Sequence, residues 1–458
     1  MKPRKFFALA LSLALLLGCS GIASLAADTA PFRVVATPYG DGIGLHWYTK
    51  ADHSATVKID GAVPGGAGVV YGGSIFQGNY AHSVTVSGLA PGKHTYDIGG
   101  VTGAFNINPG KGHAFEFIVT GDTQASDKAG FDYSAATHKA AWARFPDAAF
   151  SVILGDHTND SDNGQWDLFF ESFAPVLAKG ALVPIAGNHD GNLKWNWFRS
   201  MFALKEPGNP FSNMTGVYYS FDYGDAHIAV LNTNDMYPMS AVQQNWFLND
   251  MMQSDAKWKL VFMHRAPYSA GNDANLPDNL IMRRVLIPLF DKAGVDLVMY
   301  GHDHQYVRTK AMYADTPVED LLWPAVDGFT PPAGTVYILP GAACSKRYDI
   351  HPDMLPSIKA AMAKHEQPGK PLFTGISIDG GTLTYQAYTY EPETGKAEAY
   401  DALTLTKTSF KGADPDYKPL PTDFIRTLPQ QLTCFFTMVA KVVFVDYLFG
   451  LLPGMIGG

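Results

Sequence analysis

Five apolar segments that each lead to a polar residue constrain the fold of this 458-residue chain most strongly. The segments FEFIVT, AFSVIL, ALVPIA, WKLVFM and VDLVMY are followed within two residues by, in order, Asp122, Asp156, Asn188, His264 and His302. Near-continuous apolar runs of this length are typical of strands buried on both faces of a sheet. Segments with helix-spaced apolar residues, such as 165–180 and 279–294, alternate with them, which predicts an α/β domain.

The polar residues at the ends of these segments predict a metal site. Ligands of α/β sheets bind beyond the carboxyl ends of the strands, so we expect the five ends to meet at one edge. Glycine precedes four of the five polar residues and allows close backbone approach. One such residue alone is more often a turn residue or a helix cap, but five in one domain favour a metal site. Oxygen and imidazole ligands without thiolate suit Zn, Mn, Fe or Mg.

Three further regions surround this pattern. Residues 31–110 alternate apolar and polar residues between Gly and Pro-Gly turns, which predicts a small β sandwich. The α/β domain is expected over 112–405, and 406–458 form a linker and an apolar tail. Lys441 and Asp446 interrupt the tail, so we expect a helix docked on the protein or on a membrane surface rather than a membrane span.

Residues 1–26 read as an export signal, with a basic start and an apolar core too short to span a bilayer. LLGC would leave Cys19 lipidated, whereas SLA at 24–26 fits ordinary signal cleavage, and both interpretations stay open. We expect a periplasmic, cell-surface or secreted protein, with membrane association through a lipid anchor or the tail. Cys344 and Cys434 could pair or remain free thiols. The formal charge of −9 argues against a nucleic-acid partner.

The ordered motifs GD, GD, GNHD, HRAPY and GHDH resemble the calcineurin-like metallophosphoesterase superfamily. Together with the β module in front and with GVYYSFDYGDAHIAVLNT, QQNWFLNDMM and GHDHQYVRT, they make residues 31–405 most similar to the purple acid phosphatases and their bacterial relatives. The resemblance implies a metallophosphoesterase sandwich of two central β-sheets flanked by helices. It also implies that the β module is fibronectin type III-like.

The resemblance assigns roles residue by residue. Asp156 would bridge two metal ions, Asp122 and His304 would bind the first, and Asn188, His264 and His302 would bind the second. His189 would contact the phosphate or protonate the leaving group. Asp160 is interpreted as the residue that orients His189.

Three departures from the family pattern stand out. The tyrosine that gives purple acid phosphatases their colour is Asn159 here, and a superfamily histidine is Gln124. Asn159, Gln124 or water would supply neutral donors instead, which predicts a colourless protein with Fe, Zn or Mn. The family also carries histidines where this chain has SAGNDA, so phosphate contact is assigned to Arg265 and Asn272.

These patterns together predict an exported phosphoesterase. A metal-bound hydroxide at a dinuclear site would attack phosphomonoesters, either as small molecules or as exposed groups. One alternative is a phosphodiesterase that acts on nucleotides or phospholipid head groups. A second alternative is a surface binding protein built on a degraded phosphoesterase scaffold.

Overall fold

The computed structural model describes residues 29–52, 54–191, 197–207, 217–234, 239–275, 277–320, 334–407, 412–422 and 426–440. The predicted export signal at 1–26, with Cys19, lies outside these residues. Most of the apolar tail, beyond residue 440, lies outside them as well.

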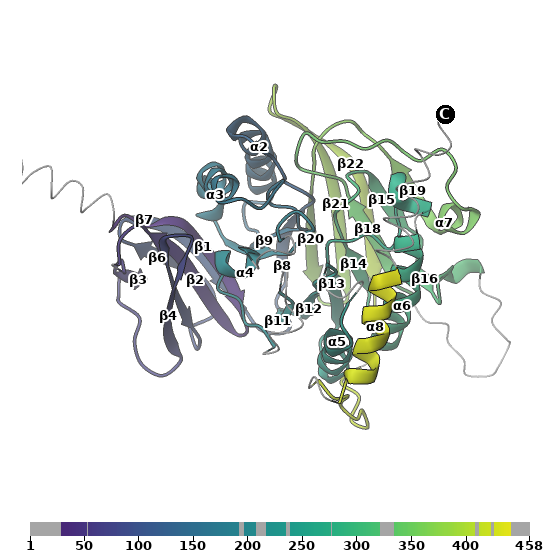
Figure 1. Ribbon diagram of the computed structural model, residues 1–458, viewed down its shortest axis with the longest axis horizontal. Coiled ribbons are helices and arrows are strands. Elements are labelled where there is room, and N and C mark those ends of the chain that lie inside the picture. The colour runs from purple at the N-terminus through teal and green to yellow at the C-terminus, as the bar shows by residue number, and fades with distance from the viewer. Residues whose placement is uncertain are drawn as a thin grey trace, which may run out of the picture.

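The N-terminal region consists of two antiparallel sheets (Figure 1). One has the order β1-β2-β5-β4 and the other β3-β6-β7. The prediction of an all-β region is confirmed, while its domain boundaries and its fibronectin type III-like character stay predictions. The strands are β1 (Phe32–Tyr39), β2 (Gly42–Thr49), β3 (Val57–Ile59), β4 (Val69–Phe76), β5 (Asn79–Val86), β6 (Gly92–Ile98) and β7 (Val101–Ile107).

A six-stranded sheet follows, in the order β10-β9-β8-β20-β21-β22. Its first three strands run parallel to one another, and the last three are joined to them by antiparallel pairing. Its strands are β8 (Phe115–Thr120), β9 (Phe150–Ile153), β10 (Ala181–Pro184), β20 (Leu372–Asp379), β21 (Thr382–Glu391) and β22 (Lys396–Thr406).

A seven-stranded sheet has the order β11-β12-β13-β14-β18-β15-β19, with β12, β13, β14 and β18 parallel. Its strands are β11 (Tyr219–Tyr223), β12 (Ala226–Val230), β13 (Trp258–Phe262), β14 (Leu297–Met299), β15 (Tyr306–Thr309), β18 (Val336–Pro340) and β19 (Met362–Glu366). The short elements are α4 (Trp197–Met201), η2 (Asn272–Asn275), β16 (Met312–Tyr313), β17 (Thr316–Pro317), η3 (Val318–Asp320) and α7 (Pro356–Ala361).

The long helices lie where the sequence periodicity predicted them, and side chains cap their starts. They are α2 (Lys128–Arg144), α3 (Asn163–Leu177), α5 (Ala241–Gln253) and α6 (Pro277–Ala293). Asp127, Asp162 and Ser240 each accept a backbone N–H from the first turn of α2, α3 and α5. Such caps satisfy N–H groups that have no partner inside a helix. Gly294, with φ of +69°, follows the end of α6 as the sequence predicted.

The two large sheets pack face to face and form a four-layer αββα sandwich (Figure 1). Phe117 of β8 meets Phe262 of β13 edge to face, with ring centres 6.0 Å apart in the core between the sheets. Helices α2 and α3 cover the outer face of the six-stranded sheet, and α5 and α6 cover that of the seven-stranded sheet. Neighbouring residues of β13 face opposite sides, since Phe262 enters the core between the sheets and Val261 packs beneath α5 and α6. The predicted two-sheet fold is therefore confirmed.

The described part of the tail packs on α5. Asn249 accepts from the backbone N–H of Leu420 (2.7 Å) and from the Tyr417 hydroxyl (2.9 Å). The following helix, α8 (Leu428–Ala440), contacts α5 through Gln430. No helix in the described part of the chain is long and apolar enough to cross a membrane. Cys344 is a buried free thiol, and the side chain of Cys434 lies outside the description.

Candidate metal centre

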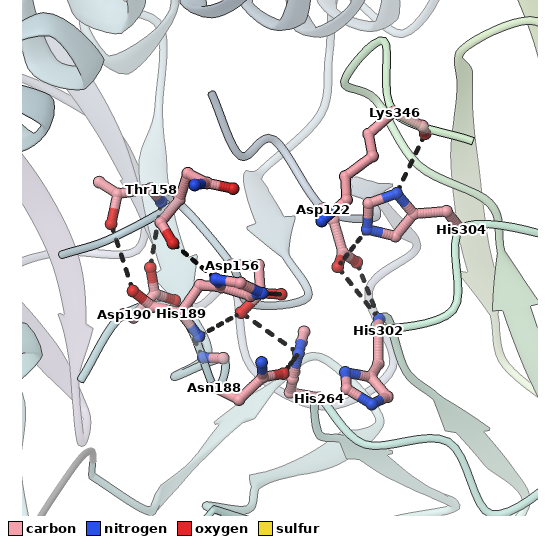
Figure 2. Close-up of polar contacts among 12 residues, drawn as sticks. Asp122, Asp156, Thr158, Asn188, His189, Asp190, His264, His302, His304 and Lys346 are labelled. Atoms are coloured by element: carbon pink, nitrogen blue, oxygen red, sulfur yellow. Dashed lines mark hydrogen bonds and ion pairs between the residues drawn. The ribbon is translucent and has the colours of Figure 1, made fainter. Parts of the chain in front are cut away.

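The polar residues at the ends of β8, β9, β10, β13 and β14 converge on one site (Figure 2). Three of these strands belong to the six-stranded sheet and two to the seven-stranded sheet. The site therefore lies where the carboxyl ends of two packed sheets meet, rather than at the edge of a single sheet. The prediction that the five strand ends come together is confirmed, and their arrangement divides into two groups.

The first group surrounds His264. Ligand atoms of Asp156, His264 and His302 all lie within 4.8 Å of one another. His264 Nε2 lies 3.3 Å from Asp156 Oδ1 and 2.9 Å from Asn188 Oδ1. Asp156 and His264 are buried. Together with Asn188 and His302 they form a compact set of oxygen and nitrogen donors.

The second group consists of Asp122 and His304. His304 Nε2 lies 3.0 Å from Asp122 Oδ2, and both side chains are buried. The backbone N–H of His302 donates to Asp122 Oδ1 (3.0 Å), which joins the two groups. The structure thus separates Asp122 and His304 from Asn188, His264 and His302.

The histidine hydrogen bonds fit a cation at each group. Nδ1 of His264 donates to the Leu154 carbonyl (2.8 Å), and Nδ1 of His304 donates to the Lys346 carbonyl (3.0 Å). In the neutral ring this leaves the Nε2 lone pair facing oxygen acceptors. Such a contact needs either a proton or a metal ion between the two atoms. A backbone carbonyl on the other ring nitrogen is also the usual partner of a metal-bound histidine.

The electrostatics of the side chains alone point the same way. Although burial by itself lowers the pKa of His264, the Asp156 carboxylate raises it to about 9. Burial likewise opposes protonation of His304, but Asp122 raises the pKa of His304 well above its ordinary value. The carboxylates therefore favour positive charge at both imidazoles. A bound metal ion would supply that charge in place of the protons.

Glycine positions and unusual backbone angles bring the strand ends together. A Cβ on Gly187 would lie 2.1 Å from the backbone nitrogen of Asp156, and one on Gly301 would lie 2.3 Å from Asp122 Oδ1. Asp156, His302 and His304 have φ values of +49°, +85° and +57°. Non-glycine residues rarely adopt this left-handed region, and those that do cluster at functional sites.

His189 lies at the open side of the centre, with its side chain one-third exposed. Its backbone N–H donates to Asp156 Oδ1 (2.8 Å), and its Nε2 lies 4.0 Å from Asp156 Oδ2. The hydrogen-bond partner of His189 differs from the predicted Asp160. Nδ1 of His189 donates instead to the carbonyl of Asn159 (2.5 Å), and Asp160 accepts from Asn159 and Gln165. A backbone carbonyl at the right distance has taken the orienting role.

Comparison with known proteins shows which family the α/β domain resembles. Residues 115–306 match the family described as calcineurin-like phosphoesterase. The Arabidopsis thaliana protein "Probable purple acid phosphatase 20" is 24% identical over 298 residues, 60% of this chain and 68% of that protein. Human "Acid phosphatase type 7" is 26% identical over 318 residues, 61% of this chain and 67% of that protein.

The fold of the purple acid phosphatase PPD1 from yellow lupin seeds is similar, with a TM-score of 0.65. It is 19% identical and the match covers 82% of this chain and 74% of that one. The similarity to purple acid phosphatases and the prediction of a phosphoesterase enzyme are confirmed. These relatives imply that the phosphoesterase domain uses metal ions.

Asn159 and Gln124 take the positions at which the sequence departs from the family. The amide nitrogen of Asn159 donates to Asp160 (3.0 Å). Gln124 is 4% exposed, and neither of its amide atoms has a hydrogen-bond partner among the described residues. An unpaired buried amide is costly and leaves Gln124 with an oxygen to offer. Their roles as ligands stay predictions.

Sequence reasoning missed two residues of this site. Asp190, the last residue of GNHD, ties the loops after β9 and β10 together through its carboxylate. Lys346 lies in the loop that follows β18. The apolar run TVYILP of this strand ends at Gly341, so it is a sixth apolar segment that is followed by glycine or by a polar residue of the site. Of the predicted substrate contacts, Arg265 directly follows His264, and Asn272 starts η2 with its side chain outside the description. Both stay predictions.

Proposed function

We propose that this protein is an exported phosphatase that hydrolyses phosphomonoesters at a centre of two metal ions. The observation that carries the proposal is the division of six ligand-type residues into two adjoining groups. Asp156 and the backbone of His302 lie where these groups meet. Carboxylates and imidazoles without thiolate suit Fe, Zn or Mn, and the absence of a tyrosine at position 159 predicts a colourless protein.

The side chains support a hydrolytic role without a serine or cysteine nucleophile. Bound metal ions would supply an activated water and would neutralise charge on the phosphoryl group. His189 would deliver a proton from Nε2 to the departing alkoxide, because that nitrogen faces the centre while Nδ1 is held by Asn159. Burial of Asp122, Asp156 and His304 keeps bulk water from weakening their interaction with the ions.

Hydrolysis assays on the chelated protein test this proposal. Mn, Zn or Fe would each be added back, and a chromogenic phosphomonoester and diester compared. Metal-restored turnover that favours the monoester is expected. Preference for the diester would support the phosphodiesterase alternative. No turnover with any metal would contradict both enzyme functions and support the surface binding protein.

Asp156→Asn tests the site within the same assay. We expect metal affinity and turnover to fall by more than about a hundredfold, since even residues that only support ligands are worth about tenfold to a hundredfold. The matched control is Asp379→Asn, because Asp379 is exposed at the end of β20. Full activity in Asp156→Asn would contradict the assignment.

Export rests on the sequence of residues 1–26 alone. Mass spectrometry of the protein recovered from a bacterial host would distinguish the two cleavage sites. A chain that begins at a lipidated Cys19 would indicate a lipoprotein, and a chain that begins after Ala26 would indicate ordinary signal cleavage. An uncleaved chain in the cytoplasm would contradict export.

A further inference from the structure

A lysine from the loop after β18 points into the metal centre. Gly341, with φ of +78°, turns the chain sharply at the end of β18. Figure 2 shows the side chain of Lys346 running from this loop toward Asp122. Neither the family motifs nor the five strand ends include this residue.

The backbone of the loop is fixed to the centre itself. The backbone N–H groups of Ala343 and Cys344 both donate to the carbonyl of Asp122 (3.0 Å each). The carbonyl of Lys346 accepts from Nδ1 of His304 (3.0 Å), and the ring of Tyr348 packs on that of His304 with centres 4.7 Å apart. Lys346 is therefore held at a defined position beside the Asp122–His304 group.

The second half of the loop is anchored by two glutamines. The side-chain amide of Gln367 donates to the carbonyls of Tyr348 (2.7 Å) and His304 (3.2 Å). Gln305 donates weakly to the carbonyls of Tyr348 and Asp349, at 3.4 and 3.3 Å. Anchors on both sides of Lys346 limit the entropy that its ammonium would lose on binding a ligand.

Tyr348 and the Asp156 carboxylate favour the charged form of Lys346. Burial lowers the pKa of Lys346, but Tyr348 and the Asp156 carboxylate outweigh that effect and raise it. Hydrogen bonds from Asn159 and Gln165 lower the pKa of Asp160, and the charges of His189 and Lys346 add to this effect. Nζ also lies 5.2 Å from the centre of the Tyr348 ring. The side chain of Lys346 therefore runs past the Tyr348 ring toward the centre (Figure 2).

We propose that Lys346 binds a phosphoryl oxygen of the substrate. The inference rests on the proposed phosphoesterase function and adds a substrate contact to it. An ammonium beside metal ions is repelled by them unless an anion lies between, and a phosphoryl group carries enough oxygens to contact both. Lysine binds phosphate as a point charge and needs no bidentate geometry.

Binding of inorganic phosphate to the metal-loaded full chain tests this directly. Isothermal titration calorimetry would compare the wild type with Lys346→Met and Lys346→Arg, with metal content measured by elemental analysis. Removing a charge-assisted hydrogen bond should weaken phosphate binding about tenfold to a hundredfold in Lys346→Met. Lys346→Arg should retain most of the affinity, and the metal content of all three should be equal. Lys370→Met is the control, because Lys370 pairs with Glu391 at the surface.

Each outcome bears on a different claim. Unchanged phosphate affinity in Lys346→Met, in a protein that still hydrolyses esters, would overturn the role of Lys346 and leave the proposed function intact. Loss of metal from Lys346→Met would also overturn the proposed phosphate contact, because it would show that Lys346 maintains the structure of the loop instead. A wild type that neither binds phosphate nor hydrolyses any ester would overturn both proposals.

Discussion

At the scale of single residues, Asp190 joins two of the loops that carry candidate ligands. Its carboxylate accepts from the backbone N–H of Gly187 (2.9 Å) and from that of His157 (2.7 Å). It also pairs with Nδ1 of His157 (2.9 Å), and both side chains are fully buried. Asp190 therefore sets the distance between the loop of Asp156 and the loop of Asn188 and His189.

Asp190→Asn should lower metal affinity about tenfold to a hundredfold, the range typical of residues that support metal ligands. The amide keeps the size of the carboxylate but loses its charge and one of its acceptor oxygens. Retained metal after dialysis against graded chelator is the measurement, and Asp379→Asn again serves as the control. Wild-type metal retention would contradict a positioning role for Asp190.

At the scale of elements, short strands present the candidate ligands on loops that pass very close to one another. The glycines before these residues make that approach sterically feasible, most clearly at Gly187. The sequence predicted this use of glycine, because four of the five strand ends carried one. The atoms that a Cβ on each of these glycines would meet belong to other loops. Only the folded structure shows which loops these are.

Gly187→Ala should disrupt the centre while the sheets still form. The new Cβ would meet the backbone nitrogen and Oδ1 of Asp156, each at 2.1 Å, so the two loops must separate. We expect loss of bound metal in elemental analysis with a circular dichroism spectrum close to that of the wild type. Gly65→Ala is the control, since no atom lies within 4 Å of the methyl carbon that this substitution would add. Full metal content in Gly187→Ala would contradict the argument.

A buried histidine links β11, β12 and α5 and makes their packing depend on pH. Nδ1 of His227 lies 2.7 Å from Asp222 and its Nε2 lies 2.8 Å from Asp250. Burial lowers the pKa of His227, but the two carboxylates raise it from 6.5 to about 9. The folded state therefore binds this proton more tightly than the unfolded state does. The resulting stabilisation is fully present below pH 6.5 and is lost as the pH rises through about 9.

His227→Gln should remove this pH dependence. Between about pH 6 and about pH 10 the wild type should lose about 3 kcal/mol more unfolding free energy than the variant. Urea unfolding of both proteins at the two pH values gives the difference, with the exposed His113→Gln as control. Equal losses in the wild type and in His227→Gln would show that the pKa of His227 is not raised.

At the scale of the whole molecule, Arg33 connects the N-terminal sheets to the phosphoesterase domain. Its side chain is 1% exposed and pairs with Asp167 of α3 (2.8 Å). It also donates to the Asn163 carbonyl (2.9 Å) and lies over the ring of Tyr48. A buried guanidinium with these partners fixes β1 against α3, so we expect the two regions to unfold together.

Arg33→Met should weaken this junction. Breaking a buried pair is costly, but Asp167 is 44% exposed and can regain water, so we expect a loss of about 2 kcal/mol. Urea unfolding followed by tryptophan fluorescence measures it, and Lys58→Met on the exposed side of β3 is the control. Unchanged stability in Arg33→Met would show that other contacts hold the two regions together.

The sequence by itself determined which residues could form the centre. Apolar runs, glycines and polar ends are local features, and they correctly predicted the sheets, the long helices and the convergence of Asp122, Asp156, Asn188, His264 and His302. Buried strands and helices require apolar residues at regular spacing, and ligands in such sheets follow the ends of strands. Both features can therefore be recognised in the amino-acid sequence.

Only the tertiary structure decided which of these groups touch. The carbonyl of Asn159, and not the predicted Asp160, accepts the hydrogen bond of His189. Lys346 reaches the centre from the loop after β18, far along the chain from the site residues that follow strands of the six-stranded sheet. Main-chain carbonyls are the same at every residue, so no sequence pattern marks the one that will accept from a given histidine. Contacts of that kind depend on how the two sheets and their loops pack. The distances that this packing sets cannot be derived from the spacing of residues along the chain.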